Sequence, residues 1–264
     1  MLLYLTPALT AYLLLLTALL GLVMGSFLNC LAWRLAHNEP VSRGRSHCPA
    51  CGHTLAARDL VPLLSWLLLR GRCRYCGAPV SPRYPAAELV TALAYVSVVA
   101  RYGPTLSALR GLVLMSLLIA ASLVDLEDGW IPDRLILAGI GAFVLLALPD
   151  AAPLAALGRG LFGALAVALP LLGLVLLADR LLGRETMGGG DIKLLFMIGL
   201  YFDWRLNLLL LIAACLLGLA LAFILGRARP NAPFPFGPAL AAAAWLVLLA
   251  GQPALDWYLG LFLI

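Results

Sequence analysis

The fold of this 264-residue chain is decided by its opening stretch, MLLYLTPALTAYLLLLTALLGLVMGSFLNCLAW, residues 1–33, which contains no charged residue. A helix rises about 1.5 Å per residue, so a helix of this length exceeds the roughly 30 Å of hydrocarbon in a bilayer. A cleaved signal peptide would have a basic start and a shorter apolar core. The stretch therefore predicts a first transmembrane helix.

The composition extends this prediction to the whole chain. Hydrophobic residues make up 63% of it and charged residues 12%, and its mean hydropathy is +1.01, outside the range of soluble domains. We expect an all-α polytopic membrane protein with about eight transmembrane helices. The shortest predicted span, 194–202, has a half-helix packed inside the bundle as its alternative. The seven further charge-free windows are 89–100, 111–124, 135–149, 160–178, 194–202, 206–226 and 230–255.

The basic residues predict the orientation of this bundle. An even number of spans puts both termini on one side of the membrane. The loops on the opposite side carry fourteen of the eighteen Lys and Arg residues, so the positive-inside rule makes those loops cytoplasmic. The net charge of +5 requires no nucleic-acid partner, because arginines in the cytoplasmic loops account for it. Membrane lipid is the expected surroundings. These loops are 34–85, 125–134, 179–193 and 227–238.

A polar, Arg-rich insert, residues 34–85, separates the first helix (1–33) from the membrane core (86–264). It contains two C-x-x-C pairs, with 21 residues between them. Four thiolates at this spacing suit a tetrahedral zinc ion, and a site closed by four protein ligands is structural. Two disulfides or a redox dithiol are the alternatives, and a cytoplasmic location disfavours disulfides. The predicted ligands are Cys48, Cys51, Cys73 and Cys76.

Two acids lie where predicted helices meet the cytoplasmic face. Asp125 directly follows the charge-free window 111–124, and Asp191 follows three glycines, Gly188, Gly189 and Gly190. Paired carboxylates can hydrolyse a peptide bond by sharing one proton, and glycines let an extended substrate approach the backbone. Taken singly, Asp125 is equally explained as a helix cap and the glycines as a flexible helix entry.

Two further charged residues are candidates near the substrate. Lys193, the only lysine, lies two residues after Asp191 and could hold an anion or anchor the helix at the interface. Glu88 could orient the substrate or pair with a neighbouring arginine.

Several ordered motifs resemble the type IV prepilin leader peptidases, which are GxGD-class membrane aspartic proteases. The resemblance covers nearly the whole chain. In order, the motifs are GSFLN at 25–29 with Arg34, the two C-x-x-C pairs flanking SWLLLRG at 65–71, YPAAEL at 84–89, Asp125 with IPD at 131–133, GGGDIK at 188–193 and PFGP at 235–238.

The resemblance implies a function and a location. It places the two catalytic aspartates on Asp125 and Asp191. It implies cleavage of the leader from prepilins and pseudopilins after glycine, at the cytoplasmic face of the bacterial inner membrane. It also implies methylation of the new N-terminus with S-adenosylmethionine, for which the residues themselves give no signal. The alternatives from other classes are a proton-coupled transporter and a zinc-linked assembly scaffold.

Overall fold

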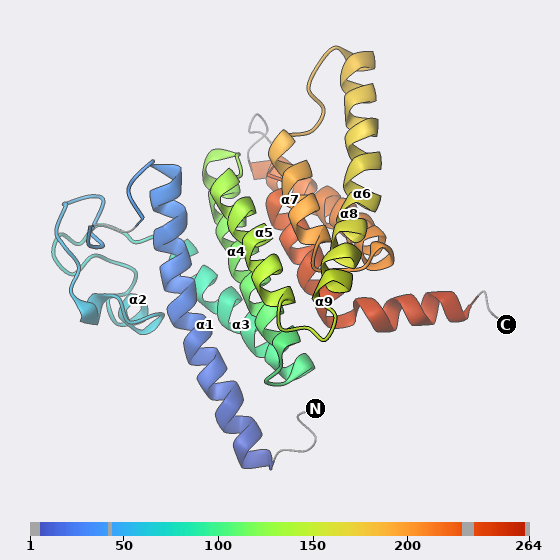
Figure 1. The fold of residues 1–264 in the computed structure, drawn as a ribbon. Helices are drawn as coiled ribbons and strands as arrows, with labels where there is room; N and C mark the ends of the chain where they lie inside the picture. Colours follow the sequence, from blue (N-terminus) through green and yellow to red (C-terminus); the bar gives the residue numbers. More distant parts are fainter. Residues whose placement is uncertain (1–5, 42–43, 229–234, 262–264) are drawn as a thin grey trace. The chain divides into compact units, whose positions relative to one another are not determined.

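The computed structural model describes residues 6–41, 44–228 and 235–261. It consists of two compact units, Met1–Ala108 and Leu109–Ile264, which Figure 1 shows as helical ribbons. Within the described ranges no strand forms, and extended segments make only two isolated bridges, His47 with Thr54 and Arg72 with Pro79. The predicted all-α class is confirmed. The predicted division at residues 33 and 85 stays a prediction.

The first unit contains a pair of long helices, α1 (Pro7–Ala36) and α3 (Arg83–Tyr102). Thr6 caps α1 by accepting the Leu9 N–H, and Pro7 occupies the first turn, where its missing N–H costs nothing. Glycines bring the two backbones close together. A Cβ at Gly21 would lie 2.6 Å from Ala92 Cα, and one at Gly25 would lie 2.6 Å from Glu88 Cα. The pair is therefore packed at glycine contacts.

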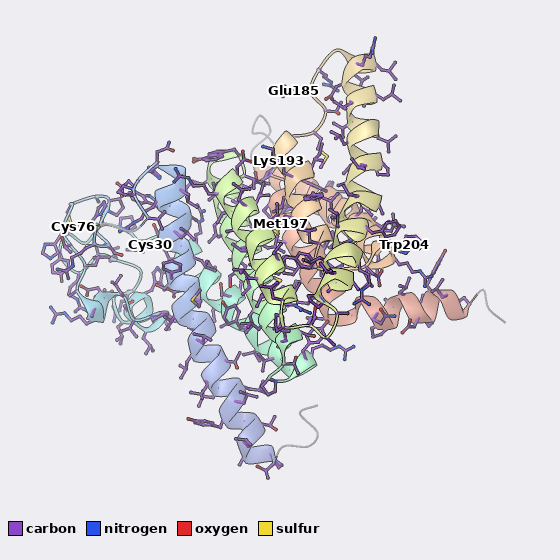
Figure 2. The ribbon with its side chains drawn as sticks, viewed as in Figure 1. Cys30, Cys76, Glu185, Lys193, Met197 and Trp204 are labelled. Carbon is purple, nitrogen blue, oxygen red and sulfur yellow. The ribbon has the colours of Figure 1, made fainter. Side chains whose placement is uncertain are left out.

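The insert joins α1 to α3 and contains only short helices, the 3-10 turn η2 (Ala57–Asp59) and α2 (Leu64–Leu68). Arg34, buried at the end of α1, donates hydrogen bonds to the carbonyl oxygens of Pro40, Val41 and Gly44. Figure 2 places Cys76 in the insert and Cys30 on α1. Hydrogen bonds to main-chain carbonyls therefore fold the start of the insert back onto the helix end.

The second unit packs its helices around buried apolar residues. In α4, Leu114, Leu118 and Val124 are fully buried. Close packing of α6 and α7 depends on Gly199, where a Cβ would lie 2.7 Å from Ala164 Cα. The helices of this unit are α4 (Leu106–Asp128), which enters it at Leu109, α5 (Asp133–Ala147), α6 (Pro153–Leu182), α7 (Gly189–Gly199), α8 (Trp204–Ala228) and α9 (Gly237–Gly260).

The predicted count of eight spans is not confirmed, although each predicted window overlaps one of these helices. Among the described residues, five helices are long and apolar enough to cross a membrane: α1, α4, α6, α8 and α9. With 15 and 11 residues, α5 and α7 are too short for a span of about 20 residues. The 20 residues of α3 include Arg83, Glu88 and Arg101, which make it too polar. The even count behind the predicted orientation is therefore not confirmed either.

The short helix α7 is a buried element of the second unit. Leu194, Leu195, Met197 and Ile198 are almost fully buried, and Figure 2 shows Met197 about one turn beyond Lys193. These features favour the alternative predicted for 194–202, a half-helix packed inside the bundle. The start of the last predicted span, 230–234, lies outside the described residues.

Candidate active site

Asp125 occupies the last turn of α4, and its side chain is buried within the protein. It is only 6% exposed, and its Oδ2 accepts the Gly237 N–H at 2.8 Å. A Cβ at position 237 would lie 2.8 Å from that same oxygen, so any side chain there would displace the carboxyl group. Glycine at the start of α9 therefore lets a main-chain N–H reach the carboxyl group and fix its direction.

Asp191 lies in the first turn of α7, which begins after the N-cap residue Gly188. Carboxylates are favoured at helix N-termini, where unpaired N–H groups concentrate positive potential. Burial nevertheless raises the pKa of Asp191 to about 6, and the nearby charge of Asp125 adds to the rise. Asp191 therefore keeps its proton to a higher pH than an ordinary aspartate.

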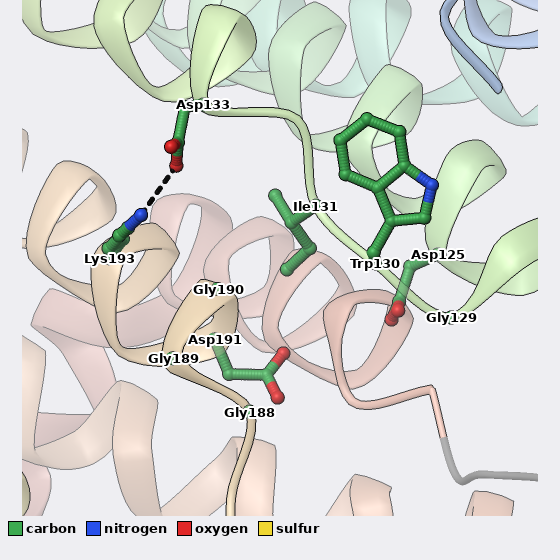
Figure 3. Close-up of a pocket in the computed structure, with 10 residues that line it drawn as sticks. All are labelled: Asp125, Gly129, Trp130, Ile131, Asp133, Gly188, Gly189, Gly190, Asp191 and Lys193. Carbon is green, nitrogen blue, oxygen red and sulfur yellow. Dashed lines mark hydrogen bonds and ion pairs between the residues drawn. The ribbon is translucent and has the colours of Figure 1, made fainter.

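The two acids line one pocket of about 330 Å³. Figure 3 shows the Asp125 side chain entering from the end of α4 and the Asp191 side chain from the start of α7, both directed into the same space. Like charges held close together disfavour double ionisation, so the charge of Asp125 disfavours ionisation of Asp191. The lining residues are Asp125, Gly129, Trp130, Ile131, Asp133, Gly188, Gly189, Gly190, Asp191 and Lys193.

Such a pair has the groups that peptide hydrolysis requires. An ionised carboxylate can accept a proton from water as the water oxygen attacks a peptide carbonyl carbon, and a protonated carboxyl can donate its proton to the carbonyl oxygen. The structure thus places together the two acids that the sequence could only assign to the same membrane face.

The three glycines form one wall of this pocket. A Cβ at Gly189 would meet no other atom within 4 Å, whereas one at Gly188 would lie 3.3 Å from Asp191 Oδ2 and one at Gly190 3.4 Å from Ile131 Cβ. The wall therefore has free space at Gly189, whereas other atoms lie close to Gly188 and Gly190 on either side. This arrangement suits the predicted approach of an extended peptide.

Lys193 has a partner that the sequence prediction missed. Its Nζ lies 2.8 Å from Asp133 Oδ1, and both side chains are more than half exposed. Figure 3 shows this ion pair joining α7 to the start of α5. Asp133 thus lines the pocket, whereas Asp128, three residues after Asp125, is exposed and is not among the lining residues.

Glu88 belongs to the first unit, and there it supports the insert. It is 7% exposed, and its Oε2 accepts the Leu63 N–H at 2.8 Å. This hydrogen bond accounts for the burial of the Glu88 side chain, because it holds the insert against α3. Its predicted role beside the substrate stays a prediction.

The four predicted zinc ligands come together in the insert. Their Sγ atoms all lie within 4.8 Å of one another, and Cys48 Sγ is 3.9 Å from Cys76 Sγ. Each pair sits on a matching turn: Gly52 N–H donates to Cys48 O, and Gly77 N–H donates to Cys73 O. Both glycines have a φ near +70°, which glycine adopts without strain. This donor set suits a metal such as zinc.

Trp130 and Ile131 were not predicted as site residues, yet both line the pocket, and Gly237 donates a hydrogen bond to Asp125. Gly237 belongs to the PFGP motif at 235–238, so the motif was visible in the sequence. Its hydrogen bond to an acid 112 positions away was not, because it depends on how α9 packs.

These features define a polytopic membrane protein with a paired-carboxylate pocket and a four-cysteine insert. Two family models match the chain: a bacterial peptidase A24 N-terminal domain over residues 19–102 and the type IV leader peptidase family over residues 112–223. The chain belongs to the type IV leader peptidase family.

Curated relatives agree with this family. A prepilin leader peptidase/N-methyltransferase of Aeromonas hydrophila is 36% identical, with 93% of each chain covered. Enzymes of the same name from Pseudomonas aeruginosa and Burkholderia pseudomallei are each 35% identical; the first match covers 92% of both chains, the second 89% of this chain and 84% of the relative. No solved structure matches the chain significantly.

Proposed function

We propose that this protein is a membrane aspartic endopeptidase that removes the leader from type IV prepilins and type II secretion pseudopilins. The observation that carries the proposal is the convergence of Asp125 and Asp191 on one pocket beside an open glycine wall. The names of the relatives supply the substrate class.

The proposed reaction uses both acids and one water molecule. The ionised member of the pair takes a proton from water, and the hydroxide equivalent bonds to the carbonyl carbon after the leader glycine. The other member protonates the carbonyl oxygen. As the intermediate collapses, the C–N bond breaks and the leaving amine takes up a proton from the pair. Gly188, Gly189 and Gly190 border the peptide, with Lys193 and Asp133 at the rim.

The pocket is proposed to face the cytoplasm from the bacterial inner membrane. Support comes from the basic residues of the loops 125–134 and 179–193, which flank the two acids, and from the positive-inside rule. The four cysteines are proposed to hold one structural zinc ion, because four thiolates close its tetrahedral shell.

Methylation of the new N-terminus is the second proposed activity, with S-adenosylmethionine as the methyl donor expected from the family resemblance. The relatives' names support it. We assign the polar residues that line the pocket to peptide hydrolysis. We assign none of them to the binding of S-adenosylmethionine.

One experiment tests both activities. The purified protein in lipid is incubated with a membrane-inserted prepilin carrying a basic leader that ends in glycine, and the product is analysed by mass spectrometry. We expect a single cut after that glycine and, when S-adenosylmethionine is added, the mass of one extra methyl group. An intact substrate would refute the peptidase, and a cut but unmethylated product would refute only the second activity.

A further inference from the structure

The insert has a row of apolar side chains that are exposed and not buried in its own core. It consists of five large apolar residues within nine positions. The leucine ridge, as we call it, comprises Leu60 (41% exposed), Val61 (41%), Leu64 (58%), Leu67 (60%) and Leu68 (80%). Five exposed apolar side chains on so short a segment are more than the scattered apolar residues of an ordinary surface, and they suggest that another apolar phase is bound here.

The ridge is held in a fixed shape from behind. Trp66 Nε1 donates to Val80 O at 3.0 Å, and Gly71 N–H donates to Trp66 O at 2.8 Å. Leu63, at the start of α2, has a φ of +59°, a conformation that a leucine keeps only when its surroundings enforce it. The hydrogen bond from its N–H to buried Glu88 supplies that enforcement.

That same hydrogen bond ties the ridge to the helix pair of α3 and the candidate membrane span α1. Glu88 lies in α3, which packs along the spanning helix α1 at Gly21 and Gly25. In Figure 1, α2 lies level with the middle of α1 and not beyond its C-terminal end. Exposed apolar residues on α1, such as Leu15 and Leu19, belong to the surface that faces lipid. The start of the ridge is therefore tied beside Gly25, inside the charge-free stretch of the spanning helix α1.

Positive charge borders the ridge as a bilayer would require. Arg58 precedes it, and Arg70 and Arg72 follow α2, all three with exposed side chains. Guanidinium groups beside an apolar surface favour anionic headgroups and let the apolar residues reach the acyl chains.

We propose that the leucine ridge inserts into the lipid bilayer and so docks the cysteine-bearing insert on the membrane. The occupant is lipid and not a partner protein, because the ridge is tethered to α3 beside a spanning helix and is bordered by arginines. This role is independent of the peptidase reaction.

Photo-crosslinking in the full-length protein tests the proposal. A benzophenone amino acid replaces Leu68, and the protein is reconstituted in vesicles of phosphatidylethanolamine and phosphatidylglycerol. Illumination should give a lipid adduct, detected by mass spectrometry of the ridge peptide. The matched control carries the same probe at Thr54, an exposed position of the insert, and should give at least several-fold less lipid adduct. Unchanged zinc content would verify that both variants are folded.

Two results would overturn the proposal. A crosslink from position 68 to another part of this chain or to a second copy would make the ridge a protein contact. Equal lipid adducts at positions 68 and 54 would show that lipid contact is not specific to the ridge. In a second variant, which combines Leu67→Gln and Leu68→Gln, an added protease should cut the insert several-fold faster in the same vesicles. An unchanged rate of proteolysis would also contradict docking.

Discussion

The cysteine cluster and the acid pocket are both polar sites of a membrane protein, but they are assembled in different ways. Each half of the cluster is a turn of a few residues that closes its own hydrogen bond, from Gly52 to Cys48 and from Gly77 to Cys73. The pocket is lined by residues from the end of α4, the start of α5 and the start of α7, and Gly237 at the start of α9 donates a hydrogen bond to Asp125.

This difference teaches that the two sites should fail independently. Damage to the insert should release metal and loosen a local fold, because metal binding and folding are coupled there. Replacing an acid of the pocket should stop peptide hydrolysis while the fold persists, because a buried acid at an active site serves catalysis and is not needed for stability.

The largest effect should come from the acids. Asp125→Asn and Asp191→Asn should each reduce leader cleavage by a factor of about 100 to 10,000, because an amide cannot exchange the proton that the reaction moves. Cleavage is measured on a prepilin at matched protein concentration, with thermal unfolding of the whole protein as the test of folding. Asp128→Asn is the matched control, since Asp128 lies one turn further on α4 and is exposed. Full activity in either pocket variant would contradict the assignment.

A nearly equal effect should follow from one methyl group at position 237. Gly237→Ala would place a Cβ 2.8 Å from Asp125 Oδ2, so the carboxyl group must move. A displacement of about 1 Å can slow an enzyme roughly 100-fold, and we expect a loss of that order in kcat. Gly173→Ala on α6 is the control, because a Cβ there meets nothing within 4 Å. Equal activity of the two variants would show that Gly237 does not position Asp125.

The metal site should show the opposite pattern. Cys48→Ser should lose the bound zinc and make the insert sensitive to protease, while leader cleavage falls far less than in the acid variants. Metal analysis under reducing conditions and limited proteolysis measure these effects. Retained zinc with a fully protected insert would contradict the four-cysteine site. Loss of cleavage as severe as in Asp125→Asn would contradict the independence of the two sites.

The smallest effect should come from the ion pair at the rim. Lys193→Met and Asp133→Asn each break a contact between two exposed groups. Such contacts contribute about 0.2 to 1 kcal/mol, so kcat/KM should change by less than about fivefold. The double variant should differ little from either single one, because the second change removes no further contact. A loss as large as that of the acid variants would move Lys193 or Asp133 into the reaction itself.

What the sequence determined by itself was local chemistry. The charge-free windows predicted membrane helices because a bilayer excludes ionised groups over a known thickness. The spacing of Cys48, Cys51, Cys73 and Cys76 predicted a cluster because a C-x-x-C turn presents both of its sulfurs to one point. The motifs around Asp125 and Asp191 predicted both acids as candidates, before any contact between them was known.

Only the tertiary structure decided how these pieces meet. A charge-free window gives the length of an apolar stretch and not the bounds of its helix, so within the described residues only five of the eight matching helices are long and apolar enough to span a membrane. The Gly237 N–H reaches Asp125, and Lys193 reaches Asp133, across 112 and 60 positions of the chain. No local pattern encodes such distances, because they arise when α4, α5, α7 and α9 pack their buried faces together.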